Sequence, residues 1–200
     1  MRSSTRFSTR DLTLIALFAV LAIIGGKIVL PVLMIPFTLQ TAVCLLTGLL
    51  LGGKRAMLAQ GLYIFMGLAG LPVFAAGGGP AYVLQPSFGY LPGMLLGAGL
   101  IGILTDRVDP RREQIRFRHL LPINLAGLLV IYLCGVGYLY IIKNIYTPGS
   151  FSFIRALQVG FLPYLITDGS YMVAVAAIGP AIRRATRAYL LPRPKIPQST

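Results

Sequence analysis

The sequence predicts an all-α integral membrane protein, a single bundle of six transmembrane helices. Apolar residues make up 56% of the 200 residues and charged residues only 12%, whereas a typical soluble domain has about 25% charged residues. The apolar residues are gathered in long runs, and the charges lie between the runs and at the two ends. Glycine is frequent, with 23 residues, as expected where membrane helices pack closely.

Six apolar runs predict the helices, at about residues 12–27, 38–51, 56–71, 90–104, 120–142 and 163–182. Capping residues at 8–11 precede the first helix. A Gly-Gly-Lys-Arg sequence at 52–55 separates the second helix from the third. Pro163 suits the first turn of the last helix, because its missing N–H would have no partner there in any case.

Positive charges are distributed unevenly between the two sides of the membrane. With six crossings both termini share one side, and that side carries fifteen of the eighteen Lys and Arg residues. Such an excess marks the cytoplasmic side. We therefore expect a multi-pass plasma-membrane protein with a cytoplasmic N-terminal tail at 1–11, a transmembrane domain at 12–182 and a basic cytoplasmic tail at 183–200. The net charge of +13 then reflects orientation in a lipid bilayer, and we expect no nucleic-acid partner.

Polar and irregular segments gather on the opposite, outer side. They are the IPFTLQ segment, the Gly-, Pro- and aromatic-rich loop after the third helix, the loop after the fifth helix, and the beginning of the last helix. Non-helical backbone near membrane depth is tolerated where it is buried in protein or lines a cavity. These four features together predict a pocket that opens to the outside.

Asp168 is the one acid of five that lies within an apolar run. A carboxylate at the centre of a membrane helix costs roughly 2.5–3.5 kcal/mol, and somewhat less near an end. We expect Asp168 to make a polar contact with a molecule bound between helices. The alternatives are a contact with a neighbouring helix, or a position close enough to the interface to reach water.

Gln40, close to Thr38 at the start of the second helix, is the other polar candidate. Its amide offers a donor and an acceptor, so that with Asp168 it suits a neutral ligand bearing N–H and C=O groups. A helix–helix hydrogen bond is the alternative. The Gly-rich loop that contains Phe74 can bring backbone amides to a ligand and cover it, or can be a flexible outer connection.

Three small residues, Ala16, Ala19 and Ala22, are spaced by three along the first helix and share one of its faces. A face of small residues lets another membrane helix approach closely. The stripe can therefore dock a partner helix or pack within the bundle itself.

The sequence contains no recognisable catalytic or metal-binding set. One His and two separated Cys residues give no metal-ligand spacing, and Asp168 has no second membrane carboxylate or His beside it. GLLLGGKR at 48–55 nearly matches a phosphate-binding loop, but Arg55 replaces the Ser or Thr that holds magnesium. We therefore expect no enzyme, no metal and no cofactor, and we favour a binding or transport role.

Five segments, in this order and spacing, resemble the BioY family: IPFTLQT, GLLLG, YIFMGLAGLPVFAAGGG, QPSFGYLPGMLLGAGLIGIL and FLPYLITD. Its members are the biotin-specific substrate-binding S components of energy-coupling-factor transporters, and the resemblance covers about residues 12–182. It implies a six-helix bundle with an outward biotin pocket. It also implies a transmembrane coupling subunit and two cytosolic ATPase subunits as partners, with small residues of the first helix as the coupling contact.

On this resemblance the substrate-binding residues are expected to be Phe37, Thr38, Gln40, Phe74, Gln85, Tyr90, Asp168 and Tyr171. The last-helix Asp of the family falls on Asp168, whereas its Lys falls on Tyr171, whose hydroxyl brings no charge. The biotin carboxylate would then need another donor, such as loop amides. Two other functions stay open: an S component for another small vitamin or base, and a membrane scaffold without a ligand or an enzyme of unrecognised type.

Overall fold

The computed structural model describes residues 7–30, 37–146 and 151–190, and at Val29, Leu30, Phe37 and Leu190 it describes the backbone alone. The ends of the two predicted tails, at 1–6 and 191–200, the loop residues 31–34 and the first two residues of the IPFTLQ segment, Ile35 and Pro36, lie outside the described residues. The helices are α1 (Thr9–Lys27), α2 (Gln40–Leu51), α3 (Gly53–Leu68), α4 (Tyr90–Val108), α5 (Phe117–Tyr146), α6 (Phe153–Gly160), α7 (Leu165–Ala185) and α8 (Arg187–Leu190). Two 3-10 turns, Pro80–Leu84 and Leu162–Tyr164, and one antiparallel pair of two-residue strands, β1 (Val29–Leu30) and β2 (Phe37–Thr38), complete the described part.

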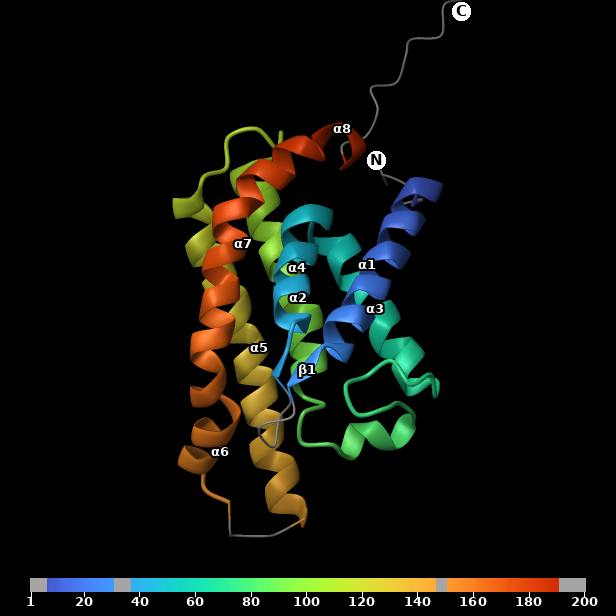
Figure 1. Ribbon diagram of the computed structural model, residues 1–200, viewed down its shortest axis with the longest axis vertical. Helices are drawn as coiled ribbons and strands as arrows, with labels where there is room; N and C mark the ends of the chain where they lie inside the picture. Colours follow the sequence, from blue (N-terminus) through green and yellow to red (C-terminus); the bar gives the residue numbers. More distant parts are fainter. Residues whose placement is uncertain (1–6, 31–36, 147–150, 191–200) are drawn as a thin grey trace, which may run out of the picture.

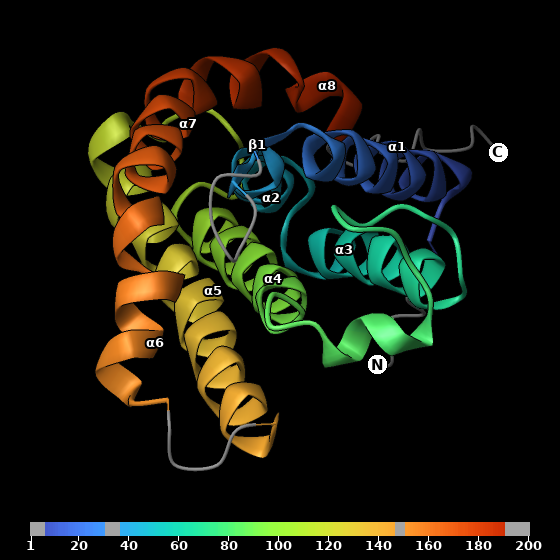
Figure 2. The same ribbon diagram turned by 60° about the horizontal axis from the view of Figure 1, so that its bottom comes forward.

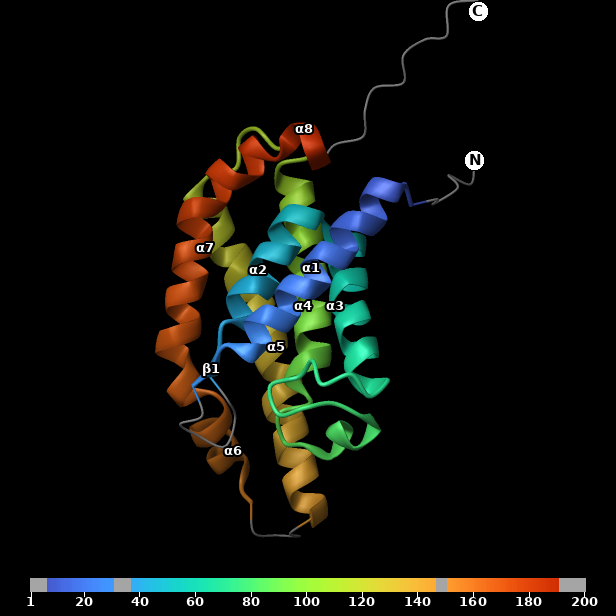
Figure 3. The same ribbon diagram turned by 45° about the vertical axis from the view of Figure 1, so that its right-hand side comes forward.

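The long helices run side by side along the long axis of the molecule (Figure 1). In the tilted view of Figure 2, α7, α2 and α1 form one row, and α5, α4 and α3 form a second row below it. The two rows meet where α4 contacts α2, α1 contacts α3 and α5 contacts α7. The β1–β2 pair and the α3–α4 connection lie at the end opposite α8 (Figure 3).

Local sequence accounts for two of the helix boundaries. The Ser8 hydroxyl accepts a hydrogen bond from the Asp11 N–H at 3.2 Å, and the Asp11 carboxylate accepts one from the Ser8 N–H at 3.0 Å. This reciprocal cap lies within the predicted capping segment at 8–11 and begins α1 at Thr9, three residues before the predicted start at about 12. Gly52 makes the single-residue turn between α2 and α3 with a φ of +79°, a conformation that glycine adopts without steric penalty.

Four helical stretches of the described residues are long and apolar enough to cross a membrane: Thr9–Lys27, Tyr90–Val108, Phe117–Tyr146 and Phe153–Ala185. This agrees with the predicted helical membrane class. α2 is apolar but has only 12 residues. At about 1.5 Å per residue, it is shorter than the hydrocarbon thickness of about 30 Å.

The last apolar region differs from the predicted single helix at 163–182. Residues 153–160 form α6, whose N-cap is the Ser152 hydroxyl that accepts from the Arg155 N–H at 3.2 Å. Pro163 lies in the 3-10 turn before α7, where its missing N–H breaks the regular helix. α7 then continues to Ala185, beyond the predicted end.

The expected basic tail also begins differently, because Arg183 belongs to α7 and is fully buried, with 0% of its surface exposed. Its guanidinium donates to the Leu49 carbonyl at 2.6 Å, to the Asp109 carbonyl at 2.9 Å and to Asp106 Oδ1 at 2.8 Å. The side chain therefore ties the end of α7 to the ends of α2 and α4. A buried cation needs such partners.

Arg112 extends this group, which we call the arginine cluster (Asp106, Asp109, Arg112 and Arg183). Its guanidinium donates to the Leu50 carbonyl at 2.7 Å and lies 3.8 Å from Asp106. Burial and the neighbouring Arg183 lower the pKa of Arg112 to about 10, so that it is charged at neutral pH. Burial raises the pKa of Asp109, but three backbone N–H groups and the Arg183 charge outweigh it and hold the pKa below its ordinary value.

Candidate functional site

A cavity lies between the two rows of helices, on the side of the β1–β2 pair. Its wall is built from α3, α5 and the first turns of α2, α4 and α7, with the α3–α4 connection alongside. The lining residues are Thr38, Gln40, Thr41, Tyr63, Ala75, Tyr82, Ser87, Tyr90, Leu91, Met94, Tyr132, Tyr164 and Asp168. Its volume is about 60 Å³, and about 620 Å³ when the open space at its mouth is included.

Asp168 is the acid of this cavity, in the first turn of α7 and only 9% exposed. The Tyr132 hydroxyl donates to Asp168 Oδ2 at 2.6 Å. The Tyr132 ring is itself held edge-on between Phe161, at 4.8 Å, and Tyr90, at 6.3 Å. An ionised carboxylate has about four lone-pair sites, so Asp168 can accept further hydrogen bonds from a molecule in the cavity.

Two other lining groups, Gln40 Nε2 and Tyr63 Oη, are buried and have no hydrogen-bond partner among the described residues. They are neighbours, because both side chains lie against Gly26 of α1. A Cβ added at Gly26 would lie 3.1 Å from Gln40 Oε1 and 3.3 Å from Tyr63 Oη. Leaving a buried donor unpaired costs about 1–3 kcal/mol, which a carbonyl oxygen of a bound molecule would relieve.

The α3–α4 connection covers one side of the cavity with aromatic side chains. Tyr82 lines the cavity, and Phe74 is fully buried behind it with the two ring centres 4.4 Å apart. Lys27 Nζ donates to the Phe74 carbonyl at 2.8 Å, and the Tyr138 hydroxyl donates to the Val83 carbonyl. The connection is thus attached to α1 at one point and to α5 at another.

Four of the eight residues that the sequence predicted for the site line the cavity: Thr38, Gln40, Tyr90 and Asp168. Tyr90 contributes its ring to the cavity wall, because its hydroxyl donates a hydrogen bond to the Gly160 carbonyl at 2.7 Å. The structure therefore brings the two polar candidates, Gln40 and Asp168, to one cavity.

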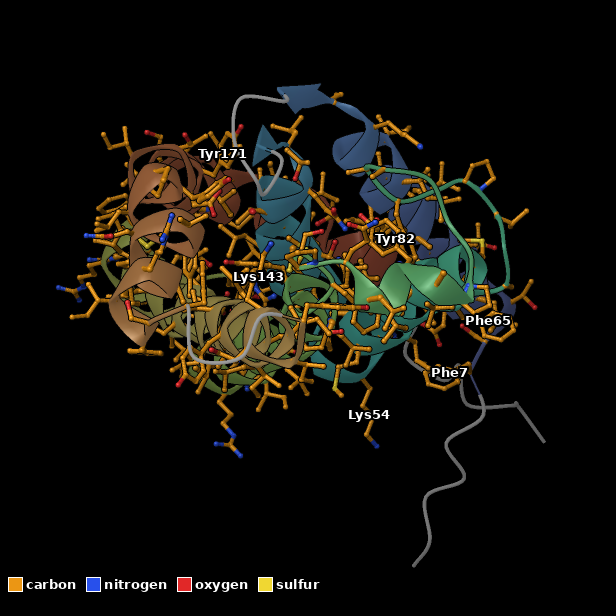
Figure 4. All side chains as sticks on the ribbon, turned by 90° about the horizontal axis from the view of Figure 1, so that it is seen from below. Phe7, Lys54, Phe65, Tyr82, Lys143 and Tyr171 are labelled. Carbon is orange, nitrogen blue, oxygen red and sulfur yellow. The ribbon has the colours of Figure 1, made fainter. Side chains whose placement is uncertain are left out.

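Three of the other four predicted residues, Phe74, Gln85 and Tyr171, are not among the described lining residues. Phe74 supports the wall from behind, and Gln85 is exposed on the α3–α4 connection. Tyr171 lies on a neighbouring face of α7, half-buried against the hydrophobic core, and Figure 4 shows it well away from Tyr82. Gln85 and Tyr171 therefore remain predicted contacts that lie outside the cavity wall, and the Phe37 side chain lies outside the described residues.

The three alanines of the predicted coupling stripe on α1 differ in burial. Ala19 and Ala22 are 1% and 0% exposed and pack in a core cluster with Tyr63 and Phe74. Ala16 is exposed. Packing within the bundle, the alternative considered from the sequence, accounts for Ala19 and Ala22, and one residue of the stripe faces outward.

Three tyrosines that line the cavity were not predicted from the sequence, namely Tyr63, Tyr132 and Tyr164. A signal was available, because Tyr132 shares a helical face with Leu128, Val136 and Leu139, all of which are buried. A buried Tyr hydroxyl needs a partner, and the intramembrane Asp168 was the natural one to propose.

The cavity offers a carboxylate acceptor, an amide donor, several hydroxyls and aromatic walls. In the described part of the chain no three His, Cys, Asp or Glu side chains come together in a way that could hold a metal ion. The arrangement is suited to binding a largely apolar molecule that carries both N–H and C=O groups.

Known proteins with similar sequences are BioY-family biotin transporters. The sequence profile of the BioY family matches residues 1–188. The probable biotin transporter BioY of Lysinibacillus sphaericus is 39% identical over 180 residues, which covers 90% of each chain. The biotin transporter BioY of Thermotoga maritima is 35% identical over 176 residues, covering 88% of this chain and 96% of the relative.

A solved structure is similar over nearly the whole length. The crystal structure of the S-component for biotin from an ECF-type ABC transporter matches with a TM-score of 0.69 and 25% sequence identity. The match covers 92% of this chain and 95% of the other.

Proposed function

The chain belongs to the BioY family, and we propose that it is the biotin-binding S component of an energy-coupling-factor transporter, which captures biotin from outside for ATP-driven uptake. The observation that carries the proposal is the buried Asp168–Tyr132 pair in the wall of a cavity between the helix rows. Biotin is uncharged at its ureido end, has an apolar thioether ring and chain, and ends in a carboxylate. It needs few polar contacts and a largely apolar wall.

The ureido group fits the polar groups of the cavity. Its two N–H groups would donate to Asp168, which Tyr132 holds in place. Its carbonyl would accept from Gln40 Nε2 or Tyr63 Oη, the buried groups without partners among the described residues. Hydrogen bonds to a charged group are worth about 1.5–3 kcal/mol each, so Asp168 would contribute most to affinity.

The thioether ring and the chain would pack against the aromatic wall, including Tyr90 and Tyr82. Thr38 would lie beside the ring, and Phe74 would support Tyr82 from behind. We keep Phe37 as a proposed member of the site. Gln85 and Tyr171 would contact biotin only if the α3–α4 connection or the start of α7 moves.

We propose six membrane crossings, with α2 and α3 in addition to the four long apolar stretches, and α6–α7 as one of them. The short α2 would reach one membrane surface through the β1–β2 pair. The basic residues of the α2–α3 turn, the α4–α5 connection and α8 would then face the cytoplasm together with both termini, in accordance with the excess of positive charge. The transmembrane domain would extend to Ala185, so that the basic tail begins later than predicted. The cavity would open to the outside of the plasma membrane.

The partners would be a transmembrane coupling subunit and cytosolic ATPase subunits. α1 is a candidate for the docking helix because its exposed side is apolar around Ala16, including Leu12, Leu17 and Val20. A small residue on that side permits close approach of another helix.

Purification in mild detergent followed by mass spectrometry of the extracted small molecules tests the proposal. We expect biotin in the extract, and saturable one-to-one binding when ligand-free protein is titrated with biotin. Recovery of a different vitamin or base would identify another S component. Absence of any bound molecule together with no binding of added biotin would favour a scaffold.

A further inference from the structure

The cavity carries one acid and no cation among its described lining residues, yet biotin ends in a carboxylate. If the ureido group lies at Asp168, the carboxylate extends away from it at the end of a four-methylene chain. A cationic partner for it must then come from beyond the described lining residues, toward the mouth of the cavity.

α5 connects Asp168 to such a donor. Tyr132, Val136, Leu139 and Lys143 follow one another at intervals of four, three and four residues, and therefore form a single stripe along α5. Tyr132 lines the cavity, and Val136 and Leu139 are buried at 4% and 0% exposure. Lys143 is the next member of the stripe, three turns beyond Tyr132.

The distance along the helix sets the span that the ligand must cover. Eleven residues of α-helix rise about 16 Å. Helical side chains lean back toward the N-terminus, and because Tyr132 and Lys143 both lean this way, a ligand that contacts both must lie extended along α5. In the view from the outer end (Figure 4), Lys143 lies toward the middle of the molecule, below Tyr171 and to the left of Tyr82.

Lys143 is also available for binding. It is half-buried on α5, and no ion pair or hydrogen bond of its ammonium is present within the described part of the chain. The other cations at this end differ from it. Lys27 already donates to the Phe74 carbonyl at 2.8 Å, and Arg155 is exposed on α6.

We propose that Lys143 binds the carboxylate of the ligand, opposite the Asp168 end of the site. The inference rests on the proposed biotin function and assigns the second polar contact of the same site. The two opposite charges would orient the ligand, since a reversed biotin would place its carboxylate against Asp168 and leave the ureido donors at Lys143. The site would therefore select an acid over its neutral analogue.

Titration of purified variants with two ligands tests this assignment. Biotin and biotin amide have the same shape, and only biotin carries the negative charge. For Lys143→Met we expect roughly a tenfold to hundredfold loss of biotin affinity, the range of one charge-assisted hydrogen bond. We expect the affinity for biotin amide to change by less than about twofold, because the amide makes no ion pair. Lys143→Arg should recover most of the biotin affinity.

Lys27→Met is the matched control, because it removes a cation from the same end without touching the proposed contact. It should not alter the ratio of the two affinities. An equal loss for both ligands in Lys143→Met would assign Lys143 a structural role and overturn the proposal, as would unchanged binding of both. If the unmutated protein fails to bind biotin, the proposed function is refuted. If the unmutated protein binds biotin and Lys143→Met binds it equally well, only the role of Lys143 is refuted.

Discussion

Replacing Arg183 by Met should destabilise the fold severely, because this side chain holds three helices together without contact with solvent. Its guanidinium donates to the carbonyls of Leu49 and Asp109 and to the carboxylate of Asp106 at 2.6–2.9 Å. Methionine has a similar length and packs well, so the substitution removes the charge and its hydrogen bonds with little change of volume.

The magnitude follows from what remains after the change. Asp109 is 4% exposed and would lose its neighbouring guanidinium, while two carbonyl groups would lose their donor. Removing one partner of a buried ion pair costs about 3–5 kcal/mol. For a chain of this size 1 kcal/mol corresponds to roughly 2–4 °C in Tm, so we expect a decrease of about 6–20 °C.

Thermal unfolding in detergent, followed with a thiol-reactive fluorophore, measures the effect. Cys44 is fully buried and becomes reactive on unfolding, and a Cys134→Ser background removes the half-buried second thiol. Arg184→Met is the matched control, since Arg184 is adjacent and exposed, and its Tm should stay within about 2 °C. A Tm for Arg183→Met as high as that of the control would refute the role assigned to the arginine cluster.

Three further predictions concern acid stability, topology and coupling. Because the pKa of Asp109 is lowered in the folded state, its contribution to stability is fully present above the ordinary value of 3.8 and is lost as pH falls through the lowered pKa. The Tm difference between the parent and Asp109→Asn should therefore shrink below that pH, and a constant difference would contradict the assignment. In intact cells an impermeant thiol reagent should label Arg155→Cys and leave Arg111→Cys unlabelled; the reverse pattern would overturn the orientation. Ala16→Leu should reduce biotin uptake at least tenfold while leaving biotin binding by the isolated protein intact. The control Ala177→Leu, at an exposed alanine of α7, should change neither uptake nor binding. Normal uptake by Ala16→Leu would exclude this face of α1 as the docking surface.

The positions of most helices could be predicted because each follows from local sequence. Apolar runs, the cap at Ser8 and Asp11 and the glycine turn at Gly52 specify helices and their ends without reference to the rest of the chain. Asp168 stood out for a similarly local reason, since a carboxylate within an apolar run needs a partner or a ligand.

The features that were missed depend on contacts between distant segments. Arg183 looked like a tail residue because it follows an apolar run, but Asp106 and Asp109 lie more than seventy residues away in the sequence and determine its burial. Tyr132 and Asp168 are 36 residues apart, so their spacing in the sequence does not predict that they form a hydrogen bond.

The coupling stripe shows a related difficulty. Spacing alone placed Ala19 and Ala22 on one face of α1 but could not say whether that face meets the bundle or lipid. The neighbouring exposed residues are also apolar, so a membrane helix lacks the polar face that marks the outside of a soluble helix. Burial against Tyr63 decided the question.

Calorimetric titration of Asp168 variants with biotin tests the central claim most directly. Asp168→Asn keeps the shape of the side chain and removes its charge, and we expect roughly a tenfold to hundredfold loss of affinity. Asp168→Leu should lose more, because the ureido donors would be buried without an acceptor. Both variants should insert and fold, since each removes an intramembrane charge, and Ser170→Ala, at an exposed position of α7, should bind like the parent. Biotin binding by Asp168→Leu as tight as that of the parent would contradict the account.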